Sequence, residues 1–397
     1  MGPDLIVRNA KLRSGKIVDI SVVEGNIQAI KEKQTGSANE IIDAQNRLVT
    51  EPFVIAHLHL DKVMTGPLAD EATLSEYHDS SRQGPIAAIE IASKVKAHYN
   101  ESDIVNRVTP LLIEAERYGV RHMRAFADVD TKAELKGIRA LLKVKDEFEG
   151  RIGLQIVAFP QDGIIKEPGT EELLYEAMEL GADVVGGIPW IEPTEVDSEK
   201  HVRIVYEIAK KYDADVSMLT DDAVDQKLRT TEYLAACAIK NGWIGRASAC
   251  HARATGMYDE VHHNKLVELL KQAKVGIVTE PQTGPAHVRV KDLLNAGVTV
   301  ALGQDDVNDA YYPYGRCNML EVAFLASHLL WMMTRQDREK LYDMITFNAA
   351  KIMRVKDYGL AVGNPADLIV LDAEDLRQAL ASHARPLYVI RNGRVLS

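Results

Sequence analysis

The 397-residue chain contains little cysteine, since only Cys237, Cys250 and Cys317 occur, far apart and odd in number. This excludes a disulfide framework and a metal module built on closely spaced cysteine pairs, and it favours a reducing, cytoplasmic setting. The chain also lacks any run of about 18 uncharged apolar residues, which excludes a membrane-spanning helix. The first residues lack a basic segment followed by an apolar core, so we expect no secretory signal peptide.

Basic residues are fewer than acidic residues. The 47 Lys and Arg residues stand against 58 Asp and Glu residues, which gives a formal net charge of −11. No basic stripe is present to neutralise phosphates, so the sequence excludes a nucleic-acid partner. With 46% apolar and 26% charged residues, the composition is that of an ordinary globular protein. The length predicts two or three domains, or one large barrel with an extra lobe.

Both ends of the chain have the pattern of short β-strands. The segments LIVRNAKL near the start and YVIRNGRVL near the end each close an apolar run with Arg-Asn. Turn signals such as Ser14-Gly15 separate the strands. We predict that residues 1–50 and 359–397 together form one small β domain, which flanks a larger unit over residues 51–358.

Strand-like runs alternate with amphipathic helical stretches between these ends. A helical example is PIAAIEIASKVKAHYN, with apolar residues at i, i+3, i+4 and i+7. Alternation of strands and helices predicts a parallel sheet, and eight such units favour a closed (β/α)8 TIM barrel. An open doubly wound sheet is the alternative, although no GxGxxG motif follows the first strand. The eight runs are LVTEPFVIAHLHL, HMRAFADV, GLQIVAFP, DVVGGIP, ADVSMLTD, RASACHA, VGIVTEP and VTVALGQDD.

Histidines and aspartates stand at the ends of these runs, where a barrel of this kind carries its functional side chains. The first strand ends in His57-Leu58-His59, and residues i and i+2 of an extended chain point to the same side. These two imidazoles can therefore converge on one metal; the alternative is that neighbouring carbonyl groups satisfy both histidines. The sixth strand ends in His251 and the eighth in Asp305-Asp306. An aspartate there can bind the metal and accept a proton from its bound water.

These segments resemble the amidohydrolase superfamily and, within it, the cytosine deaminase branch. The resemblance implies a TIM barrel with a small β-sandwich built from both termini, and it suggests a homo-oligomer. It also implies one divalent metal ion (zinc or iron, with manganese as a further candidate) that activates water for attack on a carbon bearing an amino or imino nitrogen. The matching segments are EPFVIAHLHLDK, LQIVAFPQDGI, ADVVGGIPW, RASACH, LGQDDVNDAYYPYG, NMLEVAFLASHL, GNPADLIVLDA and VIRNGRV.

The resemblance also implies roles for individual residues. His57, His59 and Asp305 match the metal ligands. His251 matches the sixth-strand histidine, which polarises the attacking water or contacts the substrate, and it is also a candidate ligand. The fourth strand, VVGGIPW, has no lysine, which argues against a two-metal site built on a carboxylated lysine.

Three further residues are candidates for binding a small heterocyclic substrate. By resemblance, Gln161 hydrogen-bonds the ring and Asp306 contacts the substrate. Trp190 ends the fourth strand and could stack on a planar ring, although a tryptophan with its N–H in water at the rim is a nearly equal alternative. Lys62 follows the HLHLD motif, and we expect it to be a solvated surface residue; the alternative is that it binds a carboxylate or carbonyl group of the substrate.

The fifth strand departs from the family pattern, which has a metal-ligand His and a general acid/base Glu in the order His-x-Asp-Glu. An ungapped alignment places Leu219 at the ligand position, with Asp221 and Asp222 at the two acidic positions. Three protein ligands still suffice for a catalytic metal with an open position. We assign Asp222 as the general acid or base. The alternative is that Asp222 caps a helix.

The leading hypothesis is therefore a metal-dependent hydrolase, similar to cytosine deaminase, that removes an amino or imino group from a small nitrogen heterocycle. In it, Asp305 accepts a proton from water, and Asp222 or His251 protonates the leaving nitrogen. Opening of a cyclic amide or removal of an N-alkylamine from a related ring comes second. Two other classes stay open: a metal-poor barrel with isomerase or lyase chemistry, and a non-catalytic ligand-binding protein.

Overall fold

The computed structural model describes residues 3–66, 94–96 and 98–396. Within these residues, the eight predicted runs form one eight-stranded parallel sheet whose strands follow one another in chain order. The predicted helix in PIAAIEIASKVKAHYN lies mostly outside the described residues. The strands are β6 (Phe53–Leu58), β7 (Val120–Asp128), β8 (Gly153–Phe159), β9 (Val184–Gly187), β10 (Asp215–Thr220), β11 (Ala247–His251), β12 (Gly276–Thr279) and β13 (Val300–Leu302).

The sheet closes on itself where the chain leaving β13 meets β6. The backbone N–H of His59 donates to the carbonyl of Asp305 at 2.8 Å. The carbonyl of His57 accepts from the N–H groups of Gln304 at 3.0 Å and Asp305 at 3.1 Å. Because the first and last strands are joined, the TIM barrel is confirmed and the open doubly wound sheet is wrong. Closure also places the HxH motif beside Asp305.

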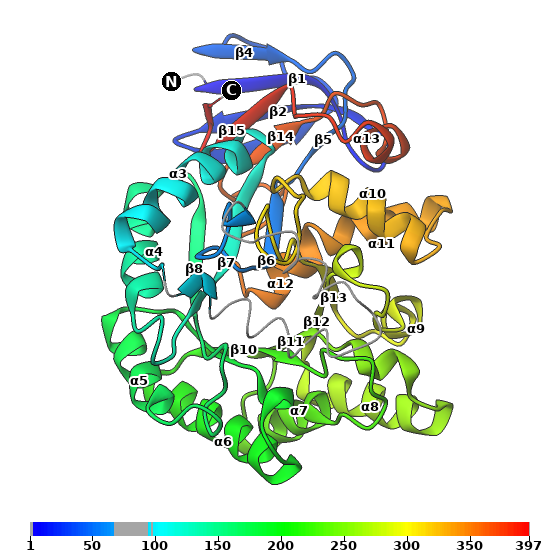
Figure 1. Ribbon diagram of the computed structural model, residues 1–397. Helices are drawn as coiled ribbons and strands as arrows, with labels where there is room; N and C mark the ends of the chain where they lie inside the picture. The colour runs from blue at the N-terminus through cyan, green and yellow to red at the C-terminus, as the bar shows by residue number, and fades with distance from the viewer. Residues whose placement is uncertain (1–2, 67–93, 97, 397) are drawn as a thin grey trace.

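Helices cover the outside of the barrel (Figure 1). Several begin at the caps that their sequences provide: the Asn100, Thr194 and Asp259 side chains accept hydrogen bonds from the first turns of α3, α6 and α8. The helices are α3 (Glu101–Arg117), α4 (Lys136–Glu147), α5 (Thr170–Leu180), α6 (Glu195–Tyr212), α7 (Thr230–Asn241), α8 (Glu260–Ala273), α9 (Val290–Asn295), α10 (Met319–Leu329), α11 (Arg335–Met344) and α12 (Phe347–Ile352).

Each barrel strand separates two apolar cores because its side chains alternate between the two faces of the sheet. In β8, Leu154 and Ile156 pack among the helices, whereas Val157 and Phe159 pack inside the barrel. The interior core also includes Leu219 of β10. This core lies directly beneath the side chains at the ends of the strands.

The small domain consists of two four-stranded sheets, ordered β3-β2-β1-β4 and β16-β15-β14-β5. The second sheet joins the two ends of the chain, because β5 pairs antiparallel with β14. Figure 1 shows this domain beside the barrel, with the two termini close together. Its strands are β1 (Leu5–Lys11), β2 (Ile17–Val23), β3 (Asn26–Lys31), β4 (Glu40–Asp43), β5 (Val49–Thr50), β14 (Leu368–Val370), β15 (Tyr388–Arg391) and β16 (Arg394–Val395), with helix α13 (Leu376–Ser382) between β14 and β15.

The two small sheets share one apolar core that includes Leu5, Ile20 and Ile390. The prediction that both ends of the chain build one β domain is therefore confirmed, whereas its exact limits, 1–50 plus 359–397 against 51–358, stay a prediction. Among the helices of the described residues, none is long and apolar enough to cross a lipid bilayer.

Candidate active site

Three strand ends bring the predicted metal ligands together at the mouth of the barrel. The Nε2 atoms of His57, His59 and His251 lie 3.0, 3.9 and 3.5 Å from Asp305 Oδ1. All four side chains are buried. His251 and Asp305 have φ angles of 63° and 66°, in the left-handed region that non-glycine residues rarely adopt. Backbone strain of this kind is concentrated at functional sites.

The spacing of these atoms fits a divalent metal ion. In a tetrahedral zinc site with bonds of about 2.0–2.1 Å, neighbouring ligand atoms lie about 3.3–3.4 Å apart. The ligand atoms of His57, His251 and Asp305 all lie within 4.8 Å of one another. This group of three could hold an ion; His59, whose Nε2 is 3.9 Å from Asp305 Oδ1, lies next to the group but is not part of it.

The charge states of these ligands also suit a metal. Burial lowers the pKa of His57, and burial together with Lys62 lowers the pKa of His59 well below its ordinary value. Both rings are therefore neutral, as metal binding requires. Burial alone would raise the pKa of Asp305, but His251 and His57 outweigh it and lower that pKa well below its usual range. Asp305 is therefore an anion.

His251 differs from the other two histidines because carboxylates surround it. Its Nδ1 lies 3.5 Å from both Asp222 Oδ1 and Glu280 Oε2. Burial alone would lower the pKa of His251, but Asp222, Asp305 and Glu280 raise it to about 9. Arg253 completes the group, with its Nε 2.8 Å from Asp222 Oδ1 in an ion pair. Arg253 Nη2 also lies 3.1 Å from His251 Nδ1, so a guanidinium as well as two carboxylates faces this nitrogen.

The carboxylates of Asp221 and Asp222 make different contacts. Asp221 holds the start of α7, because its carboxylate accepts the N–H groups of Thr230 at 2.7 Å and Thr231 at 3.0 Å. Asp222 instead faces His251 and Arg253, and its side chain is 18% exposed. The helix-cap alternative for Asp222 is therefore wrong, and its neighbour has that role.

Leu219 lies where the alignment predicts a missing imidazole. It sits on β10, in register with Cys250 of β11, the residue before His251. Only 5% of Leu219 is exposed, and it packs in the apolar core inside the barrel. At this position the fifth strand has an apolar core residue, whereas the family pattern has a histidine that binds the metal.

Glu280, which directly follows β12, is a site residue that the sequence analysis missed. It is fully buried, and within the described part of the chain neither of its carboxylate oxygens has a hydrogen-bond partner. Burial, reinforced by Asp305 and Asp222, raises its pKa to about 8 against the pull of His251. Gly303 leaves room for it, because a Cβ there would lie 2.4 Å from Glu280 Oε1. The available signal was a carboxylate directly after an apolar strand.

The three predicted substrate-binding residues lie beyond the ends of β8, β9 and β13. Gln161 and Asp306 are buried, and Trp190 is half-buried in a short 3-10 helix (Pro189–Ile191). Asp306 Oδ1 and Trp190 Nε1 lack hydrogen-bond partners among the described residues, so each has a polar atom free for a ligand. Their roles in binding substrate stay predictions.

The expectation that Lys62 is solvated is wrong. Only 1% of Lys62 is exposed, and its ammonium contacts Asp128 and lies 3.6 Å from Asp61 Oδ1. A second buried lysine, Lys96, lies 2.6 Å from Asp130 Oδ2 and belongs to the same group. The sequence pattern places Lys62 after a strand end but does not show that carboxylates from the next strand enclose it.

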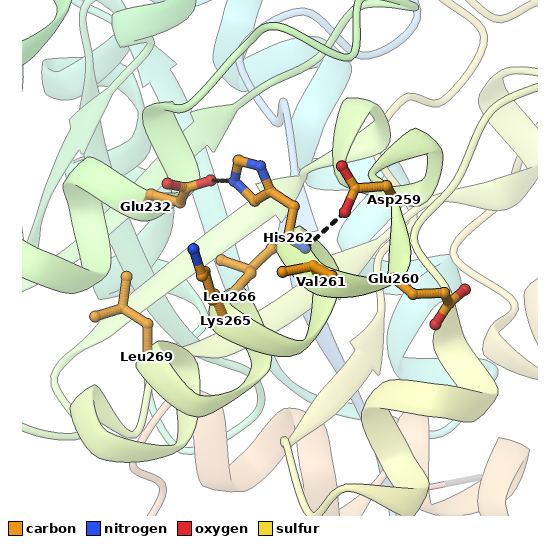
Figure 2. A pocket seen from close by; sticks show the side chains of 8 residues that line it. All are labelled: Glu232, Asp259, Glu260, Val261, His262, Lys265, Leu266 and Leu269. Atoms are coloured by element: carbon orange, nitrogen blue, oxygen red, sulfur yellow. Dashed lines mark hydrogen bonds and ion pairs between the residues drawn. The ribbon is translucent and has the colours of Figure 1, made fainter.

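A separate groove lies between α7 and α8 on the helical layer (Figure 2). His262 Nε2 contacts Glu232 there and connects the two helices, and its backbone N–H donates to Asp259 at 2.9 Å. None of the candidate ligands lines this groove. It is therefore distinct from the site at the barrel mouth.

Known proteins share both the sequence and the fold. Residues 97–397 match the Amidohydrolase family. N-isopropylammelide isopropyl amidohydrolase of Pseudomonas sp. (strain ADP) is 30% identical over 99% of this chain and 97% of that protein. The structure of 5-methylcytosine deaminase from Klebsiella pneumoniae, liganded with 5-fluorocytosine, has a TM-score of 0.91 and 34% identity, covering 99% of this chain and 97% of that one. N-isopropylammelide isopropylaminohydrolase from Burkholderia multivorans has a TM-score of 0.88 and 25% identity, covering 100% and 98%.

Proposed function

Because the chain belongs to the amidohydrolase family, we propose that it is a metal-dependent hydrolase that removes an amino group from a small nitrogen heterocycle of the cytosine or aminotriazine kind. The observation that carries this proposal is the set of three imidazole Nε2 atoms within 3.9 Å of Asp305 Oδ1. The names of the similar proteins support the substrate class, since they describe a 5-methylcytosine deaminase and N-isopropylammelide hydrolases.

His57, His59 and Asp305 would hold one divalent ion, zinc or iron with manganese as a further candidate; His251 is a further candidate ligand in place of its role as a proton donor. When bound, such an ion acts as a Lewis acid that lowers the pKa of water toward 7. The neutral rings of His57 and His59 and the anionic Asp305 are already in the states that this binding requires.

The remaining chemistry is proton transfer by the chain's own groups. A carboxylate oxygen of Asp305 accepts the proton of the attacking water. Asp222 or His251 supplies the proton that the leaving nitrogen needs; His251 Nδ1 lies 3.5 Å from Asp222 Oδ1 and 3.1 Å from Nη2 of Arg253. Gln161 and Asp306 orient the ring, and Trp190 stacks on it.

The test combines metal analysis with an ammonia-release screen over aminopyrimidines, aminotriazines and pterins. We expect about one zinc, iron or manganese ion per chain and ammonia release from at least one ring. Protein without metal under every growth condition would refute the hydrolase and favour the isomerase, lyase or ligand-binding classes. Ring-opened acids without ammonia would identify a cyclic amidase, and release of an alkylamine would identify an N-alkyl amidohydrolase. The homo-oligomer and the cytoplasmic location stay predictions.

A further inference from the structure

The buried ammonium of Lys62 has two hydrogen-bond acceptors, Asp128 and Gln161, and a second carboxylate, Asp61, close by. Its Nζ contacts Asp128 Oδ1, lies 3.6 Å from Asp61 Oδ1, and donates to Gln161 Oε1 at 3.5 Å. An ammonium donates three hydrogen bonds and accepts none. The end of the Gln161 amide that faces Lys62 is therefore its oxygen.

The lysine cannot easily turn away from this position. Asp61, whose Oδ1 forms an ion pair with Lys62, is fixed through its other oxygen, which accepts the Tyr99 hydroxyl and the backbone N–H of Asp128, both at 2.8 Å. Lys62, Asp61 and Asp128 are all buried, so water does not compete for these contacts. The amide is therefore oriented before any ligand arrives, which is the arrangement that favours selective binding.

We propose that Lys62 is a positioning residue that sets substrate specificity: it holds Oε1 of Gln161, so that the opposite end of the planar amide, Nε2, is presented to the ring as a donor. The substrate then carries a hydrogen-bond acceptor at that point, a carbonyl oxygen or an unprotonated ring nitrogen, and a ring with an amino group there is rejected. This inference rests on the proposed function, in which Gln161 contacts the ring.

The experiment compares oxo and amino rings as paired probes, cytosine with 2,4-diaminopyrimidine and ammeline with melamine, by calorimetric binding and by turnover. For the wild type we expect the oxo ring to be favoured by on the order of 10- to 100-fold, the cost of placing one buried donor against another. In Lys62→Met the amide is free to flip, and the preference should fall to within a few-fold. The effect should appear in KM and binding more than in kcat.

Lys96→Met is the matched control. Lys96 is an equally buried ammonium, 2.9 Å from Asp162 Oδ1 and 3.6 Å from Asp128 Oδ2. It should lose stability as Lys62→Met does and keep the oxo preference. Equal changes in the two variants would overturn the inference and make Lys62 a structural residue only.

A second variant retains the buried ammonium in case Lys62→Met does not fold. Gln161→Glu removes the donor while leaving Lys62 its acceptor, so the preference should shift toward the amino rings. An unchanged oxo preference in Gln161→Glu would overturn the role of the amide. Wild-type protein that neither binds nor converts any of the four rings would instead overturn the proposed function.

Discussion

Replacing Leu219 with histidine tests why the fifth strand of this barrel lacks an imidazole. Leu219 is 5% exposed in the apolar core inside the barrel. Removing a buried leucine costs about 1.5–3 kcal/mol, and leaving a buried ring nitrogen without a partner costs about 1–3 kcal/mol more. Without metal, the free energy of unfolding of Leu219→His should therefore fall by roughly 2.5–6 kcal/mol.

If the new imidazole reaches the ion, bound zinc should restore part of the free energy of unfolding that Leu219→His loses. Each tenfold gain in zinc affinity adds about 1.4 kcal/mol to the stability of the loaded protein. The assay is urea unfolding of wild type, Leu219→His and Leu219→Ala, each with excess EDTA and with a fixed excess of free zinc. Leu219→Ala is the control, because it should lose about 2–5 kcal/mol and recover no more with zinc than the wild type does. If zinc stabilises Leu219→His no more than it stabilises the wild type, the side chain at position 219 does not reach the metal and the alignment of the fifth strand is wrong.

Three further predictions follow from single contacts. His57→Ala should reduce the bound metal from about one ion per chain to none while the circular dichroism spectrum stays unchanged; a full complement of metal would exclude His57 as a ligand. Burial alone would raise the pKa of Glu192, but hydrogen bonds from His201 and from the Ile164 and Ile165 N–H groups lower it. This carboxylate therefore stabilises the fold above its ordinary pKa of about 4.5, and its contribution is lost as the pH falls through the lower value of the folded state. Urea midpoints measured from pH 7 to 3 should fall less steeply for Glu192→Gln than for the wild type, and parallel curves would contradict this. Asp221→Ala should lose about 1–2 kcal/mol of stability at the start of α7, whereas Asp222→Asn should lose on the order of 10²–10⁴-fold in turnover with little change in melting temperature; the reverse pattern would exchange the two roles.

Local sequence pattern was enough to predict the strands and the HxH motif. The run FVIAHL forms a fully buried strand, and the i, i+2 spacing of His57 and His59 brings both rings to Asp305. The pairing of the chain's two ends was also predictable, because each end carries short strands that need a partner sheet. These features depend on burial with a fixed period, which a linear sequence records directly.

Contacts between distant charged residues were not predictable in this way. Lys62 meets Asp128, 66 residues away, and Gln161, 99 residues away, only because neighbouring strands place their ends at one edge of the barrel. Closure of the barrel also places Glu280 beside His251. The aspartate that faces His251 is Asp222 and not its neighbour Asp221.

The sequence by itself therefore determined the barrel, the small β domain and the residue types at the strand ends. Only the tertiary structure decided which of those groups are buried, paired and charged. The physical reason is that a side chain's protonation and orientation depend on the dielectric surroundings and the partners that strand order and barrel closure supply.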